Sequence, residues 1–317
     1  MSWGHGLLPS QEAVATVLNR RTRVAWKHLG PARDDDSVIV DAHVHVAHLA
    51  RLKLPWEAWI GPAGDRERWA TCYDADGAAI PERISTLFAE DGVDRVLLFC
   101  EYSPKATGWQ TIEDMLPLVE HDPARFRIVA NVNPHVHHPV AAETDRQLDL
   151  GAVALKVHPV HAGIAPNDAA LYPAYARCVE RGVPVVVHTG PSNFPGATAR
   201  FGDPVLLDDV LRDFPDLVLV LAHGGRGWSY DAAASLALTR DNVWLDIAGL
   251  PPQRLPAYYE RFGIERVATK AIFGTDAPSA SAARNVAAIR DLGLPAELTE
   301  GVLGGHALRV YPGLADR

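Results

Sequence analysis

The feature that most constrains the fold is a regular alternation, from Val38 onward, between short apolar runs and longer amphipathic stretches. Eight runs rich in Val, Ile and Leu have the length of strands: VIVDAHV, RVLLFC, RIVANVNP, VALKVHP, VPVVVHTG, LVLVLAHGG, VWLDIAG and KAIFGTD. Between them lie stretches with helical spacing, such as PERISTLFAEDGV, DAALYPAYARCVERG and PVLLDDVLRDFP. Apolar strands that alternate with helices indicate a parallel sheet covered by helices.

Two architectures satisfy this pattern: an open doubly wound sheet and a closed barrel. The GxGxxG sequence that often follows the first strand of an open sheet is absent. Eight strand–helix units therefore predict a (β/α)8 TIM barrel over residues 38–317. The long segment from Leu49 to Ile80, which contains Trp56 and Trp59, follows the first strand. We expect it to form a lid-like insertion over the mouth of the barrel.

Residues 1–37 precede the first strand and are expected to form an N-terminal helical extension. Ser10 can cap a helix that runs to about Leu29, with Val14 and Leu18 on an apolar stripe. This stripe could pack on the barrel or on the second subunit of a homodimer.

The charge and cysteine content limit the class of protein. The formal net charge is −9, which argues against a nucleic-acid surface and against a basic membrane patch. No apolar run approaches the roughly 18 residues that span a bilayer. The three cysteines, Cys72, Cys100 and Cys178, form no CxxC pair. We therefore expect a reduced cytoplasmic protein that acts on a small molecule.

Residues able to bind a metal ion occur where the apolar runs end. They are His43 and His45 after the first run, Lys156 and His158 after the fourth, His188 after the fifth, His223 after the sixth and Asp276 after the eighth. The carboxyl ends of barrel strands converge on one mouth. One histidine at a strand end is more often structural, but this recurrence indicates a site for zinc or a similar divalent ion.

The motifs that carry these residues are DAHVH, ALKVHP, VPVVVHTG, LVLVLAHGGRG, AIFGTDAP and VLGGHALRVY. With them, the chain from Val38 to about Tyr311 resembles the amidohydrolase superfamily, specifically its aminocarboxymuconate-semialdehyde decarboxylase-like branch. That branch holds decarboxylases, hydrolases, lactonases and a hydratase. Two motifs depart from the branch. FGTDAP stands where FGSDWP is common, so Ala277 replaces an aromatic residue and could widen the pocket. GGHA, with His306, stands where GGNA is usual.

The resemblance implies one divalent metal ion, Zn²⁺ or alternatively Mn²⁺, bound by His43, His45, His188 and Asp276. Three neutral imidazoles and one carboxylate leave net positive charge at the ion, which can lower the pKa of a bound water from about 15.7 towards 7. Asp276 is then expected to act as a catalytic base as well as a ligand. His223 is expected to polarise the substrate or carry a proton.

Lys156 resembles the free lysine of this branch, which is not carbamylated. It could bind a substrate carboxylate or developing negative charge, or form a salt bridge with a neighbouring carboxylate. Three further residues are predicted to contact substrate: Arg226, His158 and Trp56. Arg226 could clamp a carboxylate or neutralise a nearby acid. A second HxH pair, His135 and His137, lies between prolines and is interpreted as a solvated loop.

The leading expectation is a metal-dependent hydrolase in which an activated water attacks the carbonyl of a small amide, lactone or ester. The alternative is a metal-dependent, non-oxidative decarboxylase of an aromatic or unsaturated carboxylic acid. Convergence of Lys156 and Arg226 near the metal site would favour this decarboxylase, since a carboxylate substrate needs cationic partners. A third interpretation is a non-enzymatic barrel that binds a metal or ligand, but no appended binding module supports it.

Overall fold

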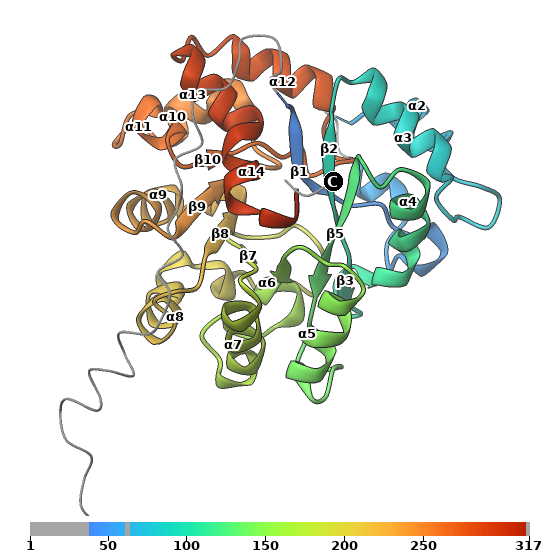
Figure 1. Ribbon diagram of the computed structural model, residues 1–317, viewed down its shortest axis with the longest axis horizontal. Coiled ribbons are helices and arrows are strands. Elements are labelled where there is room, and N and C mark those ends of the chain that lie inside the picture. The colour runs from blue at the N-terminus through green and yellow to red at the C-terminus, as the bar shows by residue number, and fades with distance from the viewer. Residues whose placement is uncertain (1–37, 61–63, 315–317) are drawn as a thin grey trace, which may run out of the picture. The chain divides into compact units, whose positions relative to one another are not determined.

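A computed structural model describes residues 38–60 and 64–314, so the N-terminal extension predicted over residues 1–37 lies outside the described residues. Eight parallel strands, in chain order, surround the centre of the fold (Figure 1). They are β1 (Val40–Val44), β2 (Arg95–Phe99), β5 (Phe126–Asn131), β6 (Leu155–Val157), β7 (Val185–His188), β8 (Leu219–Ala222), β9 (Val243–Asp246) and β10 (Ala271–Ile272). The predicted (β/α)8 barrel is confirmed, and each predicted run holds one strand.

The barrel closes between β1 and the residues that follow β10. The backbone N–H of His45 donates to the carbonyl of Ala277 at 2.8 Å, and that of Asp276 donates to the carbonyl of His43 at 2.9 Å. Closure of the sheet therefore places the end of its last strand beside the end of its first. Asp276, which is far from His43 and His45 in sequence, becomes their neighbour through these bonds.

Helices cover the outer side of the strands (Figure 1). The longer ones are α3 (Pro81–Glu90), α5 (Val140–Asp149), α7 (Tyr172–Arg181), α8 (Leu207–Asp213), α9 (Tyr230–Thr239) and α12 (Ala282–Arg290). The shorter ones are α2 (Arg66–Ala70), α4 (Leu116–His121), α6 (Pro159–Ala162), α10 (Leu255–Tyr258), α11 (Ile264–Ala268), α13 (Ala296–Glu300) and α14 (His306–Val310). The three helical stretches named from the sequence contain α3, α7 and α8.

The strands alternate between two apolar layers. In β2, Leu97 and Phe99 join the cluster inside the barrel, whereas Val96 and Leu98 pack in the layer between strands and helices. Tyr311, just after α14, is fully buried in the inner cluster. Burial of side chains on both faces explains why the strands read as nearly continuous apolar runs rather than as alternating ones.

Two features lie above the strand ends. An antiparallel hairpin, β3 (Glu101–Ser103) with β4 (Gly108–Gln110), begins directly after β2 and was not predicted. The insertion after β1 contains α2 and two short 3₁₀ helices, Leu49–Arg51 and Trp56–Ala58. Neither feature has the apolar periodicity that identifies a core strand or helix.

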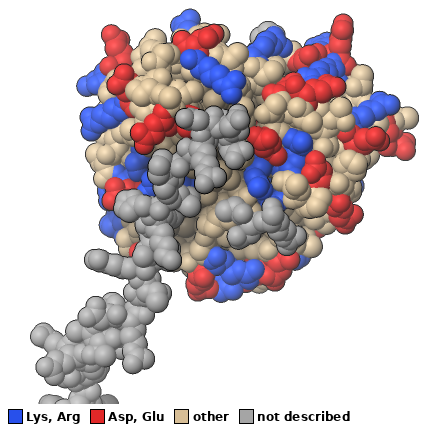
Figure 2. All heavy atoms as spheres, turned by 45° about the horizontal axis from the view of Figure 1, so that its top comes forward, with Lys and Arg blue, Asp and Glu red and all other residues tan. Residues whose placement is uncertain are grey.

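On the face shown in Figure 2, Lys and Arg side chains are interspersed with Asp and Glu. Ion pairs join such side chains among the described residues, as in Arg146 with Glu113 at 2.7 Å and Arg240 with Asp208 at 2.7 Å. No helix in residues 38–60 and 64–314 combines the length and apolar character needed to cross a membrane.

Candidate active site

A cavity of about 470 Å³ opens where the strands end. Its wall includes His45, His188, His223 and Asp276, each from the end of a different strand. Trp59 comes from the insertion after β1, which therefore covers part of the mouth as predicted. The cavity thus occupies the end of the barrel where enzymes of this fold carry their chemistry.

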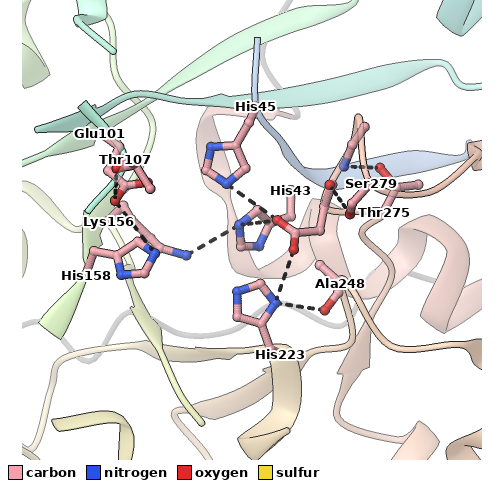
Figure 3. A network of polar contacts seen from close by, with 12 residues as sticks. His43, His45, Glu101, Thr107, Lys156, His158, His223, Ala248, Thr275 and Ser279 are labelled. Carbon is pink, nitrogen blue, oxygen red and sulfur yellow. Dashed lines mark hydrogen bonds and ion pairs between the residues drawn. The ribbon is translucent and has the colours of Figure 1, made fainter. Parts of the chain in front are cut away.

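The imidazoles of His43 and His45 lie side by side (Figure 3), and Asp276 approaches both at the seam of the barrel. Oδ1 of Asp276 lies 3.5 Å from Nε2 of His45 and 3.7 Å from Nε2 of His43. Both imidazoles are buried, and burial lowers the pKa of each below its ordinary value. Burial therefore favours the neutral form of both rings, in which each Nε2 offers a lone pair on the side of Asp276.

A shift of register within β1 makes this arrangement possible. Val40 and Ala42 face the inner cluster, but Val44 faces the outer layer, and the pairing with β2 is irregular between Asp41 and Val44. Simple alternation would have kept Val40, Ala42 and Val44 on one face. The irregularity turns His43 inward together with His45, so both imidazoles lie beside Asp276.

Asp246, at the end of β9, orients His43. Its Oδ2 lies 2.5 Å from Nδ1 of His43, so the other ring nitrogen is directed at Asp276. The ring of His43 also stacks on Phe99, with centroids 4.2 Å apart. The sequence analysis missed Asp246, although an acid at the end of the apolar run VWLD is the same signal that identified the other residues.

The donor set fits a divalent cation. One donor atom from each of His43, His45 and Asp276 lies within 4.8 Å of the others. His188 is 1% exposed, and neither of its ring nitrogens has a hydrogen-bond partner among the described residues. Such atoms are costly to bury unless a ligand satisfies them. The ring of His188 lies beside that of His223, with centroids 4.5 Å apart. The ring of His223 thus lies between His188 and the group formed by His43, His45 and Asp276.

Two cations approach the same donors. Nζ of Lys156 lies 3.4 Å from Nε2 of His43, and Nη1 of Arg226 lies 3.7 Å from Oδ2 of Asp276. Lys156 is buried over the ring of Phe99, and burial lowers its pKa to about 8. No described carboxylate forms an ion pair with Lys156, so the salt-bridge alternative is not realised. Lys156 and Arg226 therefore converge on the group formed by His43, His45 and Asp276, as a carboxylate substrate would require.

His223 and Asp276 both have left-handed backbone conformations, with φ of 63° and 60°. Such values are uncommon for residues with a side chain and often occur at functional sites. Nδ1 of His223 donates to the carbonyl of Ala248 at 2.8 Å, which leaves Nε2 as the acceptor. Oδ2 of Asp276 lies 3.9 Å from the same ring. Burial lowers the pKa of His223 well below its ordinary value, so the ring is neutral.

A second polar group lines the same cavity, formed by Glu101, His158, His161 and Ser192. Oε1 of Glu101 lies 2.6 Å from Nδ1 of His161, and Nε2 of His161 lies 2.6 Å from Oγ of Ser192. The ring of His158 stacks on that of His161 with centroids 3.7 Å apart. Glu101 was not identified from the sequence, although it directly follows the run RVLLFC.

Burial by itself would raise the pKa of Glu101, but other interactions outweigh this effect. The charge and hydrogen bond of His161, the charge of His45 and the hydrogen bond from Thr107 lower it to about 2. Glu101 is therefore ionised although it is only 1% exposed. A buried carboxylate held in this state by a histidine is typical of a functional site.

Among the predicted substrate-binding residues, Arg226 and His158 line the cavity, but Trp56 does not. Trp56 packs edge-on against Tyr73, with ring centroids 5.8 Å apart, and Trp59 takes its place at the wall. Trp56 is therefore not part of the cavity wall, because its ring packs inside the insertion.

The remaining singled-out residues lie outside the cavity wall. His137 packs against Tyr102 in the turn before α5, in agreement with a loop at His135 and His137. Ala277 is 2% exposed and does not line the cavity, so its small side chain does not widen it. Nδ1 of His306 lies 2.8 Å from the carbonyl of Ala271, where β10 begins, so its role there is structural.

The family comparison matches most of the chain: residues 40–313 fit the model described as an amidohydrolase. No curated protein matches. Among solved structures, the chain is similar to an uncharacterised TIM-barrel protein from Bordetella bronchiseptica. The identity is 22% and the TM-score 0.70, with 88% of this chain and 99% of that chain covered.

Two further solved structures carry the names of enzymes. One is a dihydroxybenzoic acid decarboxylase from Polaromonas sp. JS666 with bound manganese and the inhibitor 2-nitroresorcinol, at 16% identity and a TM-score of 0.64, covering 88% of this chain and 98% of that chain. The other is a probable 2-pyrone-4,6-dicarboxylic acid hydrolase from Acinetobacter baumannii with citric acid bound, at 16% identity and a TM-score of 0.56, covering 86% of this chain and 99% of that chain. At these identities the likeness confirms the barrel fold.

Proposed function

The chain belongs to the amidohydrolase family, and from this premise we propose that it is a metal-dependent hydrolase of a small lactone, ester or amide that carries a carboxylate group. The observation that carries the proposal is the placement of Asp276. Its Oδ1 faces His43 and His45, whereas its Oδ2 faces His223 and Arg226. One carboxylate is thus positioned to serve as a ligand on one side and as a base on the other.

We propose that His43, His45, His188 and Asp276 hold one divalent cation. Their mixture of imidazole and carboxylate suits Zn²⁺ and Mn²⁺ equally well. When bound, the cation would polarise the scissile carbonyl and make a water molecule more acidic. Asp246 would keep His43 in the orientation that this requires, through its bond to Nδ1.

The chain's own residues supply the proton transfers. Oδ2 of Asp276 would accept the proton of the attacking water and return it to the leaving oxygen or nitrogen. Nε2 of His223 is an acceptor, because Nδ1 donates to Ala248. It would orient the water or the substrate hydroxyl from the opposite side.

Lys156 and Arg226 would bind the carboxylate group of the substrate. The two cations lie beside different members of the donor group, Lys156 at His43 and Arg226 at Asp276. A carboxylate that bridges them would hold the scissile group over Asp276. The structurally similar hydrolase and decarboxylase are both named for carboxylic acid substrates, which supports this substrate class.

A second candidate is the non-oxidative decarboxylation of an aromatic or unsaturated acid. The two converging cations support it, because a carboxylate that is to leave as carbon dioxide must first be held near the cation. In that reaction Asp276 would deliver a proton to the carbon instead of to the leaving group.

The test is to load the protein with one equivalent of Zn²⁺ or Mn²⁺ and assay two substrate sets in ¹⁸O-labelled water. One set contains lactones and aryl esters with a ring carboxylate, such as 2-pyrone-4,6-dicarboxylic acid, and the other contains hydroxybenzoic acids. We expect ¹⁸O in the product carboxylate, loss of turnover on chelation, and loss of turnover in Asp276→Asn. Carbon dioxide release from the second set without hydrolysis of the first would replace the hydrolase with the decarboxylase.

A further inference from the structure

Four residues form a continuous hydrogen-bonded series at the edge of the cavity. Thr107 donates to Oε1 of Glu101 at 2.8 Å, and the same oxygen lies 2.6 Å from Nδ1 of His161. Nε2 of His161 lies 2.6 Å from Oγ of Ser192. The first three residues are buried, whereas Ser192 is half-buried and lines the cavity. The series therefore runs from the interior to a hydroxyl that a ligand can reach.

The ionised Glu101 fixes the direction of its own hydrogen bond with His161. A carboxylate only accepts, so Nδ1 of His161 must carry the proton that lies between them. In the neutral form of this imidazole Nε2 carries a lone pair, and the hydroxyl of Ser192 then donates to it. The backbone N–H of Phe194 donates to the same Oγ at 3.3 Å, which fixes the oxygen from the other side. Hydroxyl, imidazole and carboxylate thus have the polarity of a serine nucleophile with its base and its orienting acid.

We propose that Ser192, His161 and Glu101 form a second catalytic unit in this cavity, an acyl-transfer triad that acts on small esters without a metal ion. Ser192 comes from the loop after β7, His161 from α6 and Glu101 from the first position of β3. None of the three belongs to the donor set assigned to the cation. The proposal adds an activity to the proposed function and does not depend on it.

The reaction needs only an ester and water. Oγ of Ser192 forms a bond to the ester carbonyl carbon while its proton passes to Nε2 of His161. The carbon–alkoxide bond then breaks, and the alcohol leaves with that proton. Water next attacks the acyl-serine, gives its proton to Nε2, and the proton returns to Oγ as the acid departs. Glu101 stays ionised throughout and holds the imidazolium.

The surroundings of Ser192 suit this chemistry. Nε of Arg226 donates to the carbonyl of Pro191, the residue before Ser192, at 3.1 Å, so a guanidinium is held beside the nucleophile's loop. Positive charge there would stabilise the oxyanion that forms during acyl transfer. Phe194 and Trp59 pack together with ring centroids 4.8 Å apart and offer an apolar wall for the acyl group.

The experiment uses full-length protein stripped of metal with a chelator and shown to be folded by circular dichroism. It is treated with a fluorophosphonate, which bonds to activated serines. We expect one label per chain, located on Ser192 by peptide mass spectrometry. Ser279 serves as the internal control, because it lines the same cavity but donates to the backbone carbonyl of Asp276 and has no imidazole partner. The stripped protein should also release a burst of one p-nitrophenolate per chain from p-nitrophenyl acetate.

Variants distinguish activation of the Ser192 hydroxyl by His161 from simple accessibility of Ser192 to the reagent. His161→Ala should slow labelling by about 100-fold or more, the usual contribution of a general base. Glu101→Gln should slow it strongly, and Glu101→Asp should restore part of the rate because it keeps the charge. Absence of label on Ser192 in the folded, stripped protein would overturn the proposal, as would an equal rate in His161→Ala. Failure of the metal-dependent hydrolase would appear instead as a lack of turnover in the metal-loaded protein.

Discussion

His43 is held from three directions: by Asp246 at Nδ1, by the ring of Phe99, and by its place beside Asp276. An imidazole fixed in this way has one tautomer and one orientation, which is what a metal ligand needs. The residues that surround a candidate ligand therefore influence its affinity for the metal ion, and each of them can be tested by substitution.

Asp246→Asn should weaken the binding of Zn²⁺ by about 10–100-fold, because an amide does not reproduce the hydrogen bond that the carboxyl group forms with Nδ1 of His43. Isothermal titration calorimetry on the stripped protein measures the change. Asp241→Asn, an exposed aspartate just before β9, is the matched control and should bind the ion as the wild type does. Equal affinity in both variants would contradict the role of Asp246.

Lys156→Met should change the pH dependence of stability in the metal-free protein. Burial lowers the pKa of Lys156 to about 8 from an ordinary value of 10.5. Between these pH values the unfolded chain holds a proton that the folded chain lacks, so the free energy of unfolding of the wild type rises with pH. Below pH 8 both states hold the proton, and this rise is absent.

Urea unfolding at pH 7.5 and pH 10 measures the effect. The stability of the wild type relative to Lys156→Met should be greater at pH 10 than at pH 7.5. A difference that stays constant across this range would mean that the buried amine does not titrate in it.

At the scale of elements, the loops after β7 and β8 are locked together at Gly190. Its φ is 83°, and a Cβ added there would lie 2.3 Å from the carbonyl oxygen of Arg226. This close approach holds the loop after β7, which carries Ser192, against the loop after β8, which carries Arg226. Glycine at this position is therefore part of the construction of the cavity wall.

Gly190→Ala should destabilise the protein by more than the roughly 1 kcal/mol that a left-handed alanine costs, because the two loops must also separate. Gly182→Ala is the matched control, since its φ is 66° and nothing lies within 4 Å of the added Cβ. Thermal unfolding compares the two variants, and fluorophosphonate labelling of Ser192 should slow only in Gly190→Ala. Equal losses of stability would show that backbone strain alone is responsible.

The elements also show what sequence can predict. The strands and the helices α3, α7 and α8 followed from apolar periodicity, because burial on a strand or helix face leaves a regular pattern. The irregularity in β1 and the hairpin that starts at Glu101 left no such pattern, since they depend on pairing with distant residues. The same holds for Ser192 and His161, which meet only because β6 and β7 are neighbours in the sheet.

At the scale of the whole molecule, closure of the barrel turned residues at separate strand ends into one site. This was predictable for His43, His45, His188, His223 and Asp276, because each follows an apolar run and the ends of such runs must converge. Which side chain of a covering loop reaches the cavity was not predictable. Trp56 and Trp59 are three residues apart, and tertiary packing alone decides that Trp59 faces the site.

The whole fold also shields its thiols. Cys72, Cys100 and Cys178 are all buried, and burial raises the pKa of each. The native protein should therefore show no fast reaction with a thiol reagent at pH 8, and three thiols should react in denaturant. Val205→Cys, at a position 60% exposed, should add one fast-reacting thiol as a positive control. Rapid modification of the native wild type would contradict the buried placement.

Among the residues that the structure describes, His223 and Asp276 are the two with a side chain and a positive φ. A design protocol that scores only conformational energy would choose glycine at both positions, because glycine adopts this geometry without penalty. Automated thermostabilisation of this barrel would thus begin by replacing two residues that line its cavity. Conversely, a non-glycine residue with a positive φ at the end of a strand can be used to search for active sites in uncharacterised barrels.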